Sequence, residues 1–160
     1  MTNPEVWPNF IAGEAVTSDT RLDVHYPFDG SLTGQVTMIG PGELEQCIAT
    51  MLRGGKALSR HERSQILDSA RRLLLERADD FADLIRRESG LCMRETRYEV
   101  GRAQDVLQFA AMEALKDDGQ IFSCDITPHG KARKIFTTRE PLLSIVAITP
   151  FNHPLNQVAH

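Results

Sequence analysis

The chain is 160 residues long, 41% hydrophobic and 25% charged, so it can bury one modest core and carries no signature of a disordered or fibrous protein. Its formal net charge is -4 and its charges of both signs are interspersed, which argues against nucleic-acid or membrane binding. Its longest strongly apolar stretch, Leu142 to Ile148, is too short to span a bilayer, and the N-terminus lacks the pattern of a secretion signal. We therefore expect a cytoplasmic protein.

The first forty residues predict short strands joined by turns. Runs of β-type residues at 22–26 and 35–39 are separated by the turn-forming pair Asp29-Gly30 and by further glycines. From Glu43 onward, apolar residues recur at the spacing of one helical face, after a proline suited to a first turn. This pattern predicts an amphipathic helix that ends near residues 54–55.

Three further helices are predicted between residues 59 and 116. Ser59 and Glu62 have the spacing of a capping box, in which each side chain accepts a backbone N–H of the other residue. The helix that they begin has an apolar face made of Ile66, Leu67, Ala70 and Leu74. A second pattern, through Phe81, Leu84 and Ile85, stops at Gly90, a good C-terminal cap. The third helix, from Glu95 to about Lys116, has a buried stripe of Val100, Ala103, Leu107, Ala110, Ala111 and Ala114.

The last forty residues change to β-type patterns. Residues 121–127 and 131–139 alternate in polarity around a Pro-His-Gly turn, which predicts a β-hairpin. The near-continuous apolar run Leu142 to Ile148 is typical of a strand that is buried on both faces of a sheet. That strand would lead directly into the polar loop 149–154.

The loop 149–154 is the strongest candidate for a functional site. In open α/β sheets, ligands bind beyond the carboxyl ends of the strands. Pro150 and Pro154 restrict the backbone around Asn152 and His153, and Pro154 also suits the first position of a helix. A fixed Asn amide can donate to the oxygen charge that develops when a nucleophile attacks a carbonyl. The alternative is that Asn152 only caps the helix after Pro154.

The three cysteines, Cys47, Cys92 and Cys124, lie far apart and lack the spacing of metal ligands. This pattern disfavours both a disulfide framework and a zinc site. We expect buried or half-buried thiols that pack as small hydrophobic groups, and no metal site.

The C-terminal motifs resemble a known family. Arg139-Glu-Pro-Leu, the apolar run and Thr149-Pro-Phe-Asn-His-Pro are similar to the signature around the active-site asparagine of the aldehyde dehydrogenase superfamily. Phe10-Ile-Ala-Gly-Glu and Tyr26-Pro-Phe-Asp-Gly agree in order and spacing, as does Glu88-Ser-Gly, so the resemblance covers the chain from about residue 7. One departure is Leu143, where the family often has glycine, and it loosens the match to any one subfamily.

The resemblance implies an α/β fold of the aldehyde dehydrogenase type, a Rossmann-type cofactor domain with an oligomerisation β-hairpin, of which only the N-terminal part is present. Residues 1–119 would be the N-terminal part of the NAD(P)-binding domain. Residues 120–140 would be the hairpin, which would join a partner subunit in a homodimer or homotetramer. Residues 141–160 would begin the cofactor-binding sheet and form the active-site loop, and the catalytic domain would lie outside this chain.

The family's reaction oxidises an aldehyde to a carboxylic acid through a thiohemiacetal on a cysteine, with NAD or NADP as cofactor and a glutamate that assists hydrolysis. By resemblance, Asn152 would help to hold the oxyanion, and Ile148, Thr149, Pro150 and Phe151 would line the cofactor cleft. None of the three cysteines matches the motif of the nucleophile. The resemblance implies that the nucleophile and the glutamate follow residue 160, so the 160-residue segment alone is expected to be inactive.

Within the superfamily, residues 98–103, 117–134 and 149–154 look most similar to phosphonoacetaldehyde dehydrogenases, which implies a phosphonate-bearing, anionic substrate. Arg102 and His153 would then bind the substrate, because guanidinium pairs with phosphonate and imidazole can donate a further hydrogen bond.

Several alternatives stay open. Arg102 could instead form a salt bridge with Asp105 or Glu99 on the same helix, and His153 could be a satisfied structural histidine. The substrate could be another small polar aldehyde, such as a semialdehyde, a lactaldehyde or a phosphorylated triose. The chain could also be a catalytically inactive remnant or an assembly module.

Overall fold

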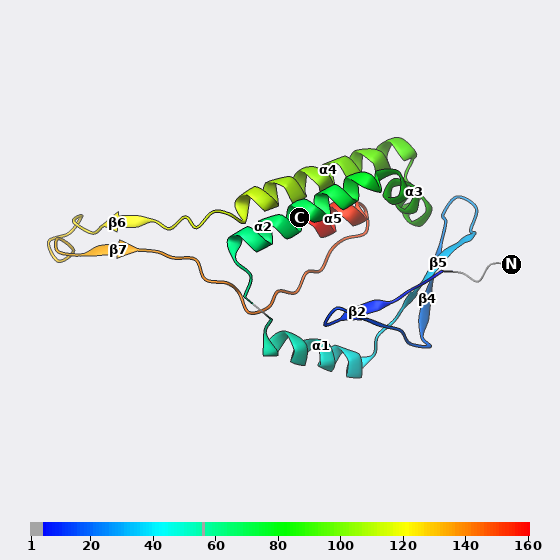
Figure 1. The fold of residues 1–160 in the computed structure, drawn as a ribbon, viewed down its shortest axis with the longest axis horizontal. Helices are drawn as coiled ribbons and strands as arrows, with labels where there is room; N and C mark the ends of the chain where they lie inside the picture. Colours follow the sequence, from blue (N-terminus) through cyan, green and yellow to red (C-terminus); the bar gives the residue numbers. More distant parts are fainter. Residues whose placement is uncertain (1–4, 56) are drawn as a thin grey trace.

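The computed structural model describes residues 5–55 and 57–160, which fold into a mixed α/β structure. Four helices pack together at its centre (Figure 1): α2 (Arg60–Glu76), α3 (Ala78–Ser89), α4 (Met93–Glu113) and α5 (Pro154–Ala159). The N-terminal strands lie at one end of this bundle, and a hairpin extends from the other end. Helix α4 is central, because α2, α3 and α5 all pack against it.

The N-terminal strands confirm the predicted pattern of short strands and turns. β1 (Val6–Trp7), β5 (Leu32–Thr37) and β4 (Arg21–His25) form a sheet in that order, with β1 parallel and β4 antiparallel to β5. β2 (Asn9–Ile11) and β3 (Glu14–Val16) form a separate antiparallel pair.

Helix α1 (Pro41–Arg53) confirms the predicted amphipathic helix between residues 43 and 55. It begins with proline in its first turn and ends at Gly54, whose φ of 70° favours glycine. The helix lies apart from the other helices (Figure 1) and contributes no buried residue. Its apolar face is only partly covered, because Leu44 is 53% and Leu52 63% exposed whereas Cys47 and Met51 are half-buried.

The predicted helix ends are confirmed by local hydrogen bonds. The Ser59 hydroxyl accepts the N–H of Glu62 at 3.2 Å, and the Glu62 carboxylate accepts the N–H of Ser59 at 2.7 Å, so the capping box of α2 is complete. Helix α3 ends at Gly90 in the left-handed conformation, with φ of 76°. A Cβ on Gly90 would lie 3.2 Å from Cβ of Pro27, so glycine also allows this close approach.

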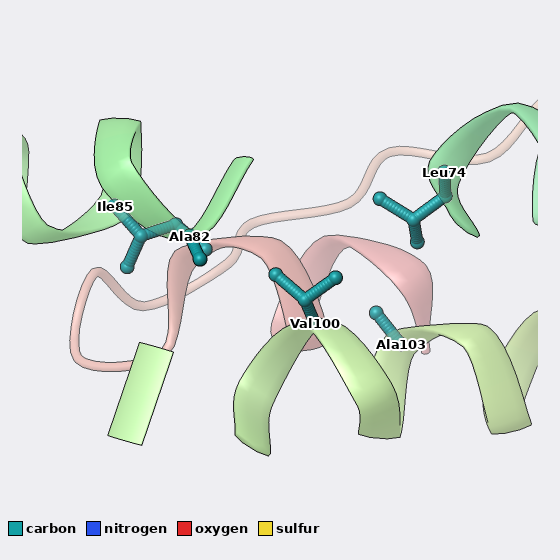
Figure 2. Packing of buried hydrophobic residues seen from close by; sticks show 5 residues of the cluster. All are labelled: Leu74, Ala82, Ile85, Val100 and Ala103. Atoms are coloured by element: carbon teal, nitrogen blue, oxygen red, sulfur yellow. The ribbon is translucent and has the colours of Figure 1, made fainter. Parts of the chain in front are cut away.

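The core lies where α2, α3 and α4 meet. Its buried side chains, drawn in Figure 2, are Leu74, Ala82, Ile85, Val100 and Ala103. The predicted stripe of α4 is confirmed, with its members buried or half-buried. The predicted face of α2 is only partly right, because Leu74 is buried whereas Ile66 is 55% exposed. Only the C-terminal end of α2 contributes a buried residue to this core, since Leu67 is half-buried and Ile66 and Ala70 are exposed.

The hairpin is confirmed but is shorter than predicted. β6 (Ile121–Ser123) pairs antiparallel with β7 (Lys134–Phe136), with Ile121 opposite Phe136. Turns fill residues 125–132, so the long alternating arms do not pair along their whole length.

The prediction of a buried strand from Leu142 to Ile148 is wrong for this structure. Residues 137–153 form neither helix nor strand, and Ile148 is 94% exposed. A strand needs a neighbouring strand for its backbone hydrogen bonds, and no segment within 5–55 or 57–160 pairs with this run. The apolar sequence therefore remains uncovered here.

Candidate active site

The candidate loop, residues 149–153, is fixed at its C-terminal end by helix α5. Pro154 occupies the first turn of α5, as predicted from its restricted backbone. Leu155 and Ala159 of the same helix pack against the central core. The loop therefore ends on a helix that packs against the core, although the loop itself is exposed.

The start of α5 is capped by Glu99, which comes from α4. Glu99 is 2% exposed, and its Oε1 accepts the N–H of Leu155 at 2.9 Å and the N–H of Asn156 at 3.0 Å. These amides belong to the first turn of α5, where the backbone N–H groups have no partner within the helix. A carboxylate is favoured there because the N-terminus of a helix carries partial positive charge.

The alternative that Asn152 caps α5 is wrong. The N-cap residue is His153, which makes no side-chain capping bond, and Glu99 accepts the amides that a cap would satisfy. Within residues 5–55 and 57–160, no hydrogen bond engages the Asn152 side chain. Its amide is thus available to a ligand.

Asn152 opens onto a cleft between the loop and the end of α3. The cleft has a volume of about 480 Å³. It is lined by Val24, Glu88, Ser89, Leu91, Phe151, Asn152 and Pro154. Desolvation raises the pKa of the Glu88 carboxyl, an effect that the neighbouring Arg87 partly opposes. The cleft therefore combines a free amide with a carboxyl group that holds its proton more strongly than usual.

His153 lies between Glu99 and solvent. Its Nδ1 is 3.4 Å from Oε2 of Glu99, while its side chain is 46% exposed. The contact with Glu99 supports the alternative that His153 is a structural histidine with a polar partner. The exposed part of the ring leaves a substrate contact open as well.

Arg102 is exposed on α4, one helical turn after Glu99. The ion pairs considered for it do not form, because Glu99 bonds to α5 and His153, and no salt bridge joins Arg102 to Asp105 among the described residues. No contact joins Arg102 to His153 within those residues either. The structure thus brings His153 and Asn152 onto one loop and leaves Arg102 as a separate, uncommitted cation.

The proposed cofactor-lining residues lie in an extended, exposed segment just before Asn152. Ile148 is 94% and Phe151 is 90% exposed, and residues 149 and 150 are also exposed. No backbone pairing engages residues 148–151 in the described structure. Apolar side chains beside free backbone groups fit the lining of a nucleotide cleft.

The cysteines and acidic residues form no metal centre in the described residues, where no group of three His, Cys, Asp or Glu side chains converges. Cys47 and Cys124 are half-buried as expected, but Cys92 is exposed, because it precedes α4 at the surface instead of joining the core. The same part of the chain contains no helix long and apolar enough to cross a membrane.

The sequence predicted no role for Glu99 at the loop, although the structure shows that it caps α5. The available signal was its place on the buried stripe of α4. Thr96 and Ala103 are 0% exposed and Val100 is 1% exposed. A glutamate among such neighbours requires a buried partner.

Comparison with known sequences supports the family assignment. The model of the aldehyde dehydrogenase family matches residues 15–160. The chain is 40% identical to an aldehyde-dehydrogenase-like protein of Sinorhizobium fredii, over 90% of this chain and 29% of that protein. It is 38% identical to aspartate-semialdehyde dehydrogenase 1 of Pseudomonas canavaninivorans, over 89% and 31%. It is 30% identical to 3-sulfolactaldehyde dehydrogenase of Priestia aryabhattai, over 100% and 34%.

Comparison with solved structures gives the same fold. The NADP-dependent glyceraldehyde-3-phosphate dehydrogenase of Bacillus halodurans, solved with NADP, superposes with a TM-score of 0.83 at 28% identity, over 96% of this chain and 33% of that chain. The chain thus spans about a third of the length of the relatives that it matches, and its fold is the N-terminal part of the aldehyde dehydrogenase fold. From its matched residues and its fold, the chain belongs to the aldehyde dehydrogenase family.

Proposed function

We propose that this chain forms the N-terminal segment of an NAD(P)-dependent dehydrogenase that oxidises an aldehyde to a carboxylic acid, and that Asn152 acts in its active site. The observation that carries the proposal is the free amide of Asn152. The cap of α5 comes from Glu99, so Asn152 is held beside an anchored helix without serving it. An unpaired amide that lies next to an anchored helix and opens onto a cleft suits the stabilisation of a reacting oxygen.

The chemistry requires such a donor. When a nucleophile adds to an aldehyde, the carbonyl oxygen gains negative charge, and an N–H donor placed beforehand lowers the energy of that state. Asn152 would donate to this oxygen, while the nucleophilic cysteine and the glutamate base would come from the rest of the enzyme. NAD or NADP, when bound, accepts a hydride from the substrate. Residues 148–151 would line its cleft through their free backbone groups and the exposed ring of Phe151.

We propose a small anionic aldehyde as substrate, with phosphonoacetaldehyde as the first candidate and phosphonoacetate as its product. Arg102 is an exposed cation that forms no ion pair with Glu99 or Asp105, so its guanidinium can pair with an anionic head group. His153 keeps nearly half of its side chain exposed beside Asn152 and can donate a further hydrogen bond.

A carboxylate or sulfonate aldehyde is the second candidate. Two relatives are named for such compounds, aspartate semialdehyde and 3-sulfolactaldehyde. Both names describe small aldehydes with an anionic group, which agrees with an Arg-dependent site but not with phosphonate in particular. Comparing kcat/KM for matched phosphonate, sulfonate and carboxylate aldehydes in the complete enzyme separates the candidates.

The hairpin of residues 120–140 would join a partner subunit in a homodimer or homotetramer. Its strands β6 and β7 extend away from the helices (Figure 1), and Ile121 and Phe136, which face each other across the pair, are 82% and 76% exposed. Exposed apolar side chains on a projecting hairpin are suited to burial against another sheet. In this arrangement residues 1–119 belong to the cofactor domain and residues 141–160 carry the active-site loop.

The test of the catalytic proposal is Asn152→Ala in the complete enzyme. Loss of one donor to a reacting oxygen is expected to lower kcat by about 100- to 1,000-fold, with KM changed much less. Gln157→Ala is the matched control, because it removes an amide from α5 that does not line the cleft. A kcat for Asn152→Ala within about threefold of the control would overturn the role of Asn152.

A further inference from the structure

We propose that Glu99 is a positioning residue, which fixes Asn152 and His153 for the reaction by holding the first turn of α5. The inference rests on the proposed function of Asn152. Glu99 would touch neither the substrate nor the reacting oxygen. It acts through the backbone of the loop that carries both functional side chains.

The geometry shows a single carboxylate that joins α4 to the loop. Oε1 of Glu99 accepts two backbone N–H groups, from Leu155 at 2.9 Å and from Asn156 at 3.0 Å. Oε2 lies 3.4 Å from Nδ1 of His153. Both carboxylate oxygens are therefore committed to a segment that lies 54 to 57 positions later in the chain.

Burial strengthens these bonds. The side chain of Glu99 is only 1% exposed, so water does not compete with the two amides for its oxygen. No Lys or Arg among the described residues pairs with this carboxylate. The amides at the start of α5 and the imidazole of His153 are its only partners there. Since Pro154 has no N–H, the two amides that Glu99 accepts are the first that α5 offers.

The position of Asn152 depends on the hydrogen bonds between Glu99 and the first turn of α5, because the surrounding chain gives the loop little other support. Residues 137–153 form no regular structure and residues 139–153 before Pro154 are all exposed, so they give the loop little other support. Asn152 is only three positions before Leu155. A small displacement of the first turn of α5 therefore moves the Asn152 amide relative to the cleft, and misplacement of a catalytic donor by about 1 Å can cost about 100-fold in rate.

The test is a double-mutant cycle in the complete enzyme with Glu99→Ala and Asn152→Ala. If Glu99 acts through Asn152, Glu99→Ala alone should lower kcat by about tenfold or more with little change in KM, yet lower it less than about twofold when Asn152 is already alanine. A merely structural role would lower activity equally in both backgrounds, and that result would overturn the inference.

Two conservative variants protect the test against a protein that fails to fold. Glu99→Gln keeps an oxygen that can accept both amides, so kcat should stay within about fivefold of the wild type. Glu99→Asp keeps the charge but is one methylene too short to reach both amides, and it should resemble Glu99→Ala. Thr96→Val is the matched control, because Thr96 is equally buried on the same face of α4 but bonds only within its own helix. Aspartate outperforming glutamine would contradict the proposed anchoring.

Hydrogen exchange separates this inference from the proposed function. Exchange of the α5 amides should become about tenfold faster in Glu99→Ala than in Thr96→Val, whatever the enzyme's activity. If Asn152→Ala kept full activity while this exchange increased, the catalytic role of Asn152 would fail and the anchor would stand. Unchanged exchange in α5 would overturn the anchor itself.

Discussion

Replacing Arg102 by leucine should impair the oxidation of anionic aldehydes selectively. Arg102 is exposed and makes no ion pair with Glu99 or Asp105, so its removal leaves no buried partner unsatisfied, and the free energy of unfolding should change by less than about 0.5 kcal/mol. A hydrogen bond to a charged group contributes about 1.5–3 kcal/mol. Loss of that interaction in the transition state corresponds to a fall in kcat/KM of about 10- to 150-fold.

The assay is NAD(P)H formation by the complete enzyme with phosphonoacetaldehyde, a sulfonate aldehyde, a semialdehyde and a neutral aldehyde of similar length. For Arg102→Leu, kcat/KM should fall for the three anions and stay within about twofold for the neutral compound. Arg102→Lys should give an intermediate loss, because lysine keeps the charge but not the paired donors. Arg94→Leu is the control, since Arg94 is on the same helix and its side chain is 87% exposed. Equal values for anionic substrates in Arg102→Leu and the control would refute the anion-binding role.

Three further predictions concern the core, the pH dependence and the hairpin. Val100→Ala removes two methyl groups from a side chain that is 1% exposed, so it should lower the free energy of unfolding by about 2–3 kcal/mol in urea titrations. The control Val158→Ala changes a side chain that is 68% exposed and should alter the free energy of unfolding by less than about 0.5 kcal/mol. The hydrogen bond from Arg86 lowers the pKa of the Asp83 carboxyl in the folded protein. The ionised carboxylate therefore stabilises the fold at pH values above its unfolded pKa of about 4. This contribution is lost as the pH falls through the lower pKa of the folded protein. The difference in urea midpoint between wild type and Asp83→Asn should therefore shrink from pH 7 to pH 3, and a constant difference would contradict it. Ile121→Asp should shift the complete enzyme toward smaller species in light scattering, and an unchanged mass would argue against the hairpin as the subunit contact.

The sequence predicted those features that depend on neighbours within a few residues. The capping box of Ser59 and Glu62 and the left-handed glycine at 90 involve groups no more than four positions apart. The stripe of α4 follows from the helical period, which brings residues three and four apart onto one face. The free energy of these features arises inside the element itself, so the spacing of residues is sufficient to locate them.

Tertiary structure decided the features whose partners are distant in sequence. The run Leu142 to Ile148 has the composition of a buried strand, but a strand forms only where another strand meets its backbone groups, and no described segment does so. Spacing also gave no reason to connect Glu99 with Leu155, because the packing of α5 on α4 brings them together. The sequence thus determined the start of α2 and the end of α3, and it showed that Asn152 follows an apolar run. Packing decided that the carboxylate of Glu99 on α4 caps α5 and that the amide of Asn152 stays free. The bonds between Glu99 and α5 depend on how the two helices are placed in space, which the local sequence does not specify.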